Sequence, residues 1–331
     1  MKSAIEIFSE LGARLAEFGS DEASHSAIVR AVGANEWFMV RDIHYAVEAI
    51  RNEMLDATKI ENWLLHYPNA GKCEPRHVAI IMAGNIPLVG FFDLMCVIAN
   101  GDIPHIKFSS KDSALMKYIV QLLRDIEPLL RIEECEEGAE YDAVIATGGD
   151  SANLYFRTAF AGTPSLLRGS RHSVAVLSGK ESAADMELLA EDIFTHSCLG
   201  CRNVSLIFVP KKFKLRLKVR EMGQAYRNNY LQCRALLKMN GAKFEDFGEA
   251  VMVHLKEAEF PRFLSQINVV EYSSLEEVKQ WLARHDEELQ CVVSGAEELH
   301  SRQVPLGKAQ RPTLFDYADE RDTMQFLASI D

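Results

Sequence analysis

The sequence has no surplus of basic residues, no long uninterrupted apolar run and no dense cysteine framework. Its 331 residues include 36 Lys and Arg against 48 Asp and Glu, which gives a formal net charge of −12 at pH 7. A chain this acidic is a poor candidate for wrapping nucleic acid, because phosphate neutralisation requires a basic surface. The 48% hydrophobic and 25% charged residues are typical of a folded globular protein, which excludes disorder and collagen-like repeats.

The cysteines do not form a pattern that suggests disulfides. The chain has an odd number, and they lie far apart: Cys73, Cys96, Cys135, Cys198, Cys201, Cys233 and Cys291. The first 18 residues contain Glu6, Glu10, Arg14 and Glu17 instead of the apolar stretch of a secretory signal. We therefore expect free thiols and a cytoplasmic protein.

The longest apolar stretch, Val78–Ala99, is interrupted by Gly84-Asn85-Ile86-Pro87 and contains Asp93. A spanning helix needs about 20 apolar residues with few breaks, so we expect no membrane span. The stretch instead predicts a buried strand over 77–82, a turn, and a helix over 87–100 that begins with Pro.

Strand and helix patterns alternate along the chain after a helical region that ends near residue 67. Strands are expected at 77–82, 103–108 and 141–146, with helices at 87–100, 110–126 and 151–161. A second set begins near residue 173, with strands at 173–177, 204–209, 250–255, 268–272 and 291–293, and helices at 183–197 and 221–240 and one from the Ser274 capping box to about Arg284. This order predicts an α/β protein whose parallel sheets carry helices on their faces.

Ligands in such folds bind beyond the carboxyl ends of strands, so the residues that follow the strands are the candidate site. Asn85 follows the first strand, where it either caps the next helix or points at a ligand. Lys107 ends the second strand, and Ser109 and Ser110 follow it as either an anion site or an ordinary helix cap.

Thr147, Gly148 and Gly149 follow the third strand. Paired glycines let a backbone approach a pyrophosphate closely, although the run is not G-x-G-x-x-G. The alternative is a tight turn with Asp150 as the helix N-cap.

Cys198 and Cys201 lie just before the strand at 204–209. They could be buried thiols, a redox pair or half of a zinc site, but no second C-x-x-C and no suitably spaced His pair completes four ligands. The functional alternative is a nucleophilic thiolate whose pKa is lowered by His196 or Arg202.

In this order, the motifs Ala-Gly-Asn85-Ile-Pro, Ile-Lys107-Phe-Ser-Ser, Ala-Thr147-Gly-Gly-Asp and Gly200-Cys201 resemble the aldehyde dehydrogenase superfamily. Within it, the chain is similar to the acyl-CoA reductase family, the reductase component of bacterial luminescence fatty-acid reductases. The tail motifs Pro305-Leu-Gly-Lys-Ala-Gln-Arg-Pro312 and Asp322-Thr-Met-Gln-Phe-Leu327 carry that closer likeness, which covers residues 35–331.

The resemblance implies two α/β lobes, with a Rossmann-like parallel sheet in the cofactor lobe. It implies residues 1–177 as a helical segment plus an NAD(P)-binding domain, 178–303 as the catalytic thiol domain, and 304–331 as a tail that packs at the domain interface. By the family pattern, the nucleophile stands seven residues before the Phe of the next Phe-Val, which selects Cys201, and Asn85 donates to the oxyanion. Lys107 holds the adenosine ribose, Ser109 and Ser110 lie beside it, and Thr147, Gly148 and Gly149 follow the pyrophosphate.

Three departures from the superfamily pattern refine this expectation. Ser110 and Lys111 stand where NAD-preferring members often have a Glu, which favours NADP(H) over NAD(H). Residues 176–180 offer no carboxylate to hydrolyse an acyl intermediate, as suits a reductase. Leu199-Gly200 replaces the usual Gly-Gln before the nucleophile.

The predicted function is NAD(P)H-dependent reduction of an acyl-CoA or acyl-carrier thioester to an aldehyde through a Cys201 thioester, without a metal. A catalytically impaired nucleotide- or acyl-CoA-binding homologue is one alternative, and a CoA-acylating aldehyde dehydrogenase working in the oxidative direction is another. We expect no nucleic-acid partner, a monomer or homodimer, and association with an acyl-supplying enzyme.

Overall fold

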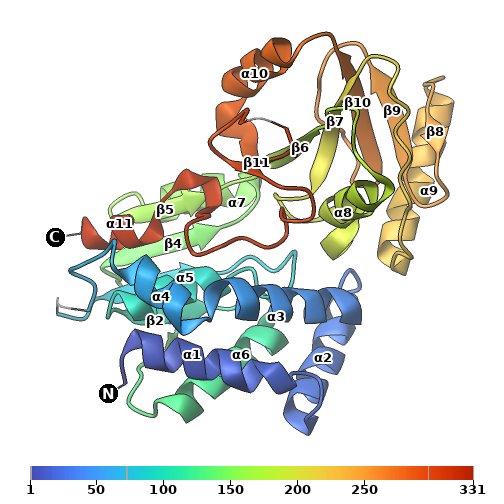
Figure 1. Cartoon of the computed structure of the whole chain (residues 1–331). Coiled ribbons are helices and arrows are strands. Elements are labelled where there is room, and N and C mark those ends of the chain that lie inside the picture. Colours follow the sequence, from blue (N-terminus) through green and yellow to red (C-terminus); the bar gives the residue numbers. More distant parts are fainter. Residues whose placement is uncertain (1, 72–73, 297, 331) are drawn as a thin grey trace. The chain divides into compact units, whose positions relative to one another are not determined.

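The computed structural model describes residues 2–71, 74–296 and 298–330, which form two compact units (Figure 1). The first unit comprises residues 1–170 and 312–331, and the second comprises residues 171–311. Both are built on mainly parallel sheets, which confirms the predicted α/β class. In the part of the chain that the structure describes, no helix is both long and apolar enough to span a membrane.

The sheet of the first unit has five parallel strands in the order β3-β2-β1-β4-β5. The chain builds outward from β1 to β3 on one side and then crosses over to β4 and β5 on the other. The strand order therefore reverses between β1 and β4, which is the switch point of a doubly wound sheet. The strands are β1 (His77–Ile81), β2 (Ile103–Lys107), β3 (Glu133–Glu134), β4 (Ala143–Thr147) and β5 (Ser165–Arg168).

Three helices connect these strands: α5 (Phe91–Ala99), α6 (Ser113–Ile126) and α7 (Asp150–Ala159). Two of them begin later than the sequence predicts, because residues 87–90 and 109–112 form turns. The sequence patterns also missed β5 and the two-residue strand β3, which are too short to show a clear alternation.

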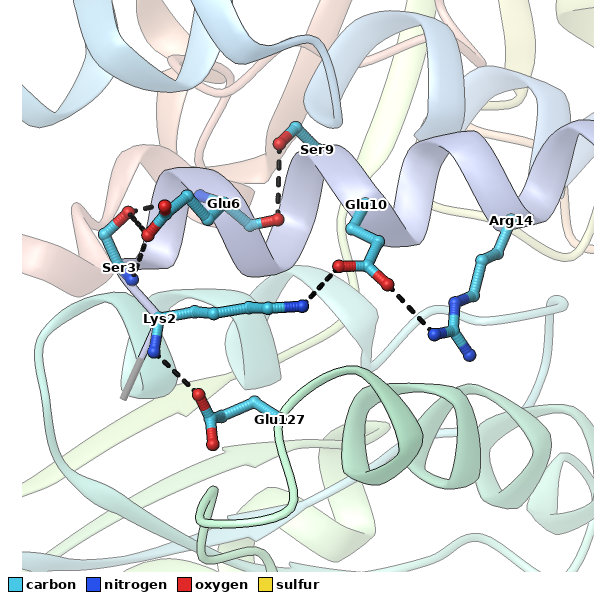
Figure 2. Close-up of polar contacts among 7 residues, drawn as sticks. All are labelled: Lys2, Ser3, Glu6, Ser9, Glu10, Arg14 and Glu127. Atoms are coloured by element: carbon cyan, nitrogen blue, oxygen red, sulfur yellow. Dashed lines mark hydrogen bonds and ion pairs between the residues drawn. The ribbon is translucent and has the colours of Figure 1, made fainter.

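The region before β1 is helical, as predicted, and its elements are α1 (Ala4–Arg14), η1 (Leu15–Glu17), α2 (Glu22–Ala34), α3 (Val40–Met54) and α4 (Ala57–Leu64). Ser3 and Glu6 form a reciprocal capping box at the start of α1. The Lys2 backbone N–H donates to Glu127 Oε2 (2.6 Å), just after α6, and the Lys2 ammonium pairs with Glu10 (Figure 2). The Lys2–Glu127 hydrogen bond joins the start of α1 to the end of α6.

The core of the first unit joins the early helices, one face of the sheet and the end of the chain. Trp63, Phe8 and Phe91 are among its fully buried side chains. The tail contributes Met324 and Leu327 from α11 (Thr323–Ala328), which contacts α5, and it also contains η4 (Ala318–Glu320). The tail therefore contributes Leu314, Tyr317, Met324 and Leu327 to this core.

A buried ion pair fixes the same region. Arg168, at the end of β5, donates to both carboxylate oxygens of Asp93 in α5 (2.6 and 2.7 Å). Its other terminal nitrogen donates to the Thr323 hydroxyl (2.6 Å). The three residues connect the sheet, a core helix and the tail.

The sheet of the second unit has seven strands in the order β12-β11-β6-β7-β10-β9-β8, and only the β8–β9 pair is antiparallel. The strands are β6 (His172–Val176), β7 (Val204–Pro210), β8 (Glu245–Asp246), β9 (Val251–Leu255), β10 (Gln266–Tyr272), β11 (Leu289–Val293) and β12 (Gln303–Val304). The helical elements are α8 (Ala183–Phe194), η2 (Thr195–Cys198), α9 (Gln224–Met239), α10 (Leu275–Arg284) and η3 (Asp286–Glu288). Ser274 caps α10 by accepting from the Glu277 N–H, which is one half of the predicted capping box, whereas the Glu277 carboxylate accepts from the Ser273 N–H (3.1 Å).

The units divide at residues 170–171, earlier than the predicted boundary at 177. The reason is β6, which pairs with β7 and β11 and so belongs to the second sheet. The boundary between the second unit and the tail lies at residues 311–312, later than the predicted 303–304. The reason is that β12 pairs with β11 and so extends the second sheet.

Candidate functional site

The carboxyl edge of the first sheet gathers three of the predicted motifs. In the strand register, Ile81 of β1 lies beside Lys107 of β2 and Ala146 of β4. The loops that follow these strands therefore leave the sheet at one edge, beside the switch point. This is the place where open α/β sheets bind ligands.

Asn85 lies half-buried in the loop after β1. It does not cap α5, because the N-cap of that helix is Gly90. The loop is anchored by Asn35, whose side-chain amide donates to the Gly84 carbonyl (3.3 Å) and the Lys111 carbonyl (3.5 Å). The helix-cap alternative for Asn85 is therefore wrong.

Asp112 holds the same loop from the other side. Its Oδ2 accepts from the Leu88 N–H (2.7 Å), and Leu88 has a φ of 58°, a left-handed conformation that is costly for leucine. The Asp112 side chain is buried, and this burial raises its pKa to about 8. Asp112 therefore holds its proton at neutral pH, and its sequence position gave no sign of this role.

The loops after β1 and β2 are in close contact. A Cβ on Gly84 would lie 2.3 Å from Ser109 Oγ, so only glycine fits there. The Ser109 and Ser110 pair does not cap α6, whose N-cap is Asp112, and Ser109 Oγ accepts instead from the Lys111 N–H (3.3 Å). Lys107 and Ser110 are exposed.

The Thr147-Gly148-Gly149 turn leads directly into α7. Its N-cap is Gly149, so the interpretation of Asp150 as the cap is wrong. Asn153 fixes the turn from inside α7, since its side-chain amide donates to the carbonyls of Gly148 (3.1 Å) and Arg168 (2.5 Å). A Cβ on Gly148 would lie 2.8 Å from that of Ala152, so the helix packs tightly on this glycine.

Cys201 belongs to the second unit, in the turn between η2 and β7, and it is half-buried. Its carbonyl accepts from the Ser173 hydroxyl of the neighbouring strand β6 (2.8 Å). None of the six cysteines that the structure describes forms a disulfide, and Cys73 lies outside the described residues. The disulfide form of Cys198 and Cys201 is therefore absent here, and among the described residues neither thiol is part of a metal-ligand cluster.

The residue that fixes the Cys201 turn is Asn203, which sequence reasoning missed. Its side-chain amide donates to the carbonyls of Asp192 (3.3 Å), Ile193 (2.9 Å) and Thr195 (2.8 Å) at the end of α8. Its Oδ1 accepts from the N–H of Gly200 (2.8 Å), the residue before Cys201. One buried side chain thus joins the helix end to the turn.

A left-handed turn precedes the thiol. His196, Ser197 and Cys198 have φ values of 58°, 56° and 60°, and each such non-glycine residue costs about 1–2 kcal/mol. Strain of this kind persists only where the surroundings determine the backbone. Burial also lowers the pKa of His196 to about 4, so the imidazole is neutral at pH 7 and does not act as a cation beside the thiol, contrary to one of the interpretations offered by the sequence.

Asp192 connects the same helix end to the tail motif. Its carboxylate accepts from the N–H groups of Gly307 (2.6 Å) and Ala309 (3.0 Å). Burial raises its pKa to about 7, and the two N–H donors act in the opposite direction. The tail segment that resembles the acyl-CoA reductases is therefore held against α8.

The fold of these two units is that of the aldehyde dehydrogenases. Aldehyde dehydrogenase 21 from Physcomitrella patens, solved with succinate, aligns with 98% of this chain and 83% of its own at a TM-score of 0.68 and 10% identity. A propionaldehyde dehydrogenase from Clostridium phytofermentans aligns with 89% of this chain and 78% of its own (TM-score 0.58, 10% identity). Betaine aldehyde dehydrogenase from Staphylococcus aureus, solved with NAD+, aligns with 94% and 74% (TM-score 0.58, 12% identity).

The sequence narrows this class further. The acyl-CoA reductase (LuxC) family model matches residues 37–270, which is more than half of the chain. The chain therefore belongs to the acyl-CoA reductase family, and the predicted resemblance is confirmed. It is an oxidoreductase that acts on acyl or aldehyde groups. No curated protein sequence matches it at a significant level.

Proposed function

We propose that this protein reduces an acyl thioester such as an acyl-CoA to an aldehyde, with Cys201 as the nucleophile and NAD(P)H as the reductant. The observation that carries the proposal is the Cys201 turn, in which Asn203 and Ser173 hold the backbone on both sides of the thiol. Free thiols are common, but a thiol fixed in this way within an acyl-CoA reductase is a strong candidate nucleophile.

In the first step the Cys201 thiolate attacks the thioester carbonyl carbon. The new carbon–sulfur bond forms as the carbonyl electron pair moves to oxygen, and the tetrahedral oxyanion then collapses and expels the CoA thiolate. The product is an acyl group joined to Cys201 through a thioester.

Two hydrogen-bond donors stabilise the oxyanion in this proposal, the Asn85 side-chain amide and the Cys201 backbone N–H. The assignment of Asn85 rests on the family pattern, since Asn85 belongs to the first unit and Cys201 to the second. Each such donor lowers the barrier by roughly 3 kcal/mol.

The carboxyl edge of the first sheet fits a dinucleotide. Gly149 is an exposed N-cap whose nearest neighbour to an added Cβ is Ser170 Oγ at 3.9 Å, so a pyrophosphate can approach the backbone of the Thr147–Gly149 turn and the start of α7. Lys107 is exposed at the adjacent strand end, where its ammonium can reach a ribose. A reduced nicotinamide bound at this edge would supply the hydride that converts the acyl group to an aldehyde and returns Cys201 to its thiolate.

We assign the cofactor preference to the residues after Lys107. Ser110 and Lys111 are both exposed, and together they present a hydroxyl and a cation instead of a carboxylate. A 2′-phosphate is attracted to such a pair, whereas a Glu at residue 110 would repel it. The proposed preference is NADP(H) over NAD(H).

The turn after β6 supports reduction over hydrolysis. Residues 176–180 contain no carboxylate, and the adjacent Glu181 carboxylate accepts from the Ser178 N–H (2.5 Å), the Ser178 hydroxyl (2.8 Å) and the Gly179 N–H (2.8 Å). These three contacts hold the Glu181 carboxylate within its own turn. We therefore expect the acyl group on Cys201 to react with hydride and not with water.

The test is the consumption of NADPH and NADH against a series of acyl-CoA chain lengths. We expect turnover with at least one chain length. Cys201→Ala should lower the turnover rate by at least about 1,000-fold, because it removes the covalent nucleophile. Cys198→Ala removes the neighbouring thiol and is the matched control, which should keep its activity. Wild-type turnover in Cys201→Ala would refute the assignment, and binding of both substrates without turnover would indicate a non-catalytic homologue.

A further inference from the structure

Three metal-ligating side chains lie together in the first unit and take no part in the proposed reaction. They are His77 of β1, His105 of β2 and Glu133 of β3. One ring nitrogen from each histidine and one carboxylate oxygen all lie within 4.8 Å of one another.

The strand register places these residues on one face of the sheet. His105 and Glu133 are direct partners in the parallel β2–β3 pair, and His77 is the partner of Ile103, two residues before His105. Side chains alternate between faces with a period of two, and partners share a face. The backbone of the sheet therefore brings the three together, which is the rigid support that metal sites need.

Hydrogen bonds orient the possible ligand atoms. His77 Nδ1 lies 2.7 Å from His105 Nε2, which in turn lies 3.6 Å from Glu133 Oε2. The other carboxylate oxygen of Glu133, Oε1, accepts from Arg131 (2.8 Å), and the backbone of Glu134 hydrogen-bonds the His105 ring. Metal-binding histidines and carboxylates are usually held by outer partners of this kind.

We propose that His77, His105 and Glu133 form a binding site for a divalent first-row transition-metal ion such as Zn²⁺, with water as a further ligand. Two ligands of a tetrahedral Zn²⁺ at the usual bond lengths lie ~3.3 Å apart. The His105–Glu133 pair is close to that spacing, and the two imidazoles need to separate by only about 0.6 Å. The side chain of Glu133 is 41% exposed, so the ion and its water can enter from solvent.

The site is distinct from the proposed cofactor edge. His77 is the first residue of β1, whereas that edge begins at the last residue of the strand, Ile81. None of Asn85, Lys107 and Cys201 is a ligand. Zn²⁺ binding can therefore be measured independently of reductase activity.

The test is isothermal titration calorimetry of Zn²⁺ into the full chain, after treatment with a chelator and alkylation of accessible thiols. We expect one Zn²⁺ ion to bind tightly per chain. His77→Gln and Glu133→Gln should each raise the Kd for this ion by at least about 10-fold. The matched controls are Glu245→Gln and His254→Gln, which alter an exposed carboxylate and an exposed imidazole of the second unit.

Both controls should titrate like the wild type. Circular dichroism establishes that each variant is folded. If one of the two test variants fails to fold, the titration of the other still tests the site. Absence of a tight equivalent, or identical titrations for the wild type and a folded His77→Gln or Glu133→Gln variant, would overturn the site.

Discussion

Asn203 is a buried side chain that fixes the turn of the proposed nucleophile, Cys201. An asparagine offers both donors and an acceptor, and this one uses its amide on the end of α8 and its oxygen on the Gly200 N–H. It is only 5% exposed, so water does not readily replace these contacts. We regard it as a positioning residue for Cys201.

Replacing Asn203 by Ala should lower kcat for acyl-CoA reduction by about 100-fold, because a displacement of about 1 Å at a reacting group costs that much. The free energy of unfolding should also fall by about 1–3 kcal/mol, since buried groups lose partners. Steady-state kinetics and the rate of iodoacetamide labelling at Cys201 measure the effect, with the exposed Asn240→Ala as control. If only stability changed and both rates stayed at wild-type values, the role would be structural alone.

The proposed preference for NADP(H) over NAD(H) depends on Ser110. Ser110→Glu should lower kcat/KM for NADPH by about 10-fold or more and spare that for NADH, because a carboxylate repels the 2′-phosphate and accepts from a 2′-hydroxyl. Because Ser110 is exposed, the substitution should leave the fold unchanged. An unchanged ratio of the two kcat/KM values would show that the cofactor ribose binds elsewhere.

At the scale of elements, the apolar β-branched runs predicted β1, β2 and β4 to within two residues, because each strand is buried on both faces. The starts of α5 and α6 were less predictable. Residues 87–90 continue a helical pattern, yet they form a turn because Asp112, distant in sequence, binds the Leu88 N–H. A local sequence pattern cannot indicate a hydrogen-bond partner that is distant in the sequence.

The site could be predicted in part for the same reason. Lys107 and the Thr147–Gly149 turn stand in ordered motifs at the carboxyl ends of strands, and Cys201 stands in a motif just before β7, so the sequence proposes them as candidates. Asn203 stands in no such motif, and His77 and His105 are 28 residues apart, so only the strand register brings that pair together. What the sequence could not predict are contacts made across elements.

Asp112 gives a pH-dependent prediction. The folded state keeps its proton up to about pH 8, whereas the unfolded chain loses it near the ordinary value of 3.8, so stability should decrease as the pH rises between those values. Asp112→Asn keeps an oxygen for the Leu88 N–H and removes the ionisation. Urea unfolding should show the variant gaining more than about 1 kcal/mol over the wild type between pH 5 and pH 8. Parallel curves for the two proteins across this range would contradict the burial of an ionisable group at residue 112.

On the scale of the whole molecule, the first unit is completed by a tail that follows the second unit in the sequence. The buried Arg168–Asp93 pair and its bond to Thr323 connect that tail to the sheet. Residues 1–170 without the tail would leave this arginine short of a partner and expose part of the core. The unit is therefore expected to fold fully only when the entire chain is present.

Asp93→Ala should destabilise the protein by about 3–5 kcal/mol, because it leaves the buried Arg168 charge uncompensated. Glu134→Ala breaks the exposed Lys117–Glu134 pair and should change stability by less than about 1 kcal/mol. Thermal unfolding of the two variants compares them directly. Similar losses in both would mean that the Asp93 pair is hydrated rather than buried.

The most direct test of the whole account is the mass of the intact protein after incubation with an acyl-CoA in the absence of reduced cofactor. The account predicts a single added acyl group that maps to Cys201, forms in Cys198→Ala, is absent from Cys201→Ala, and disappears as aldehyde when NADPH is added. An adduct of equal yield in Cys201→Ala, or NADPH-dependent aldehyde production by a protein that never acquires the acyl group, would contradict it.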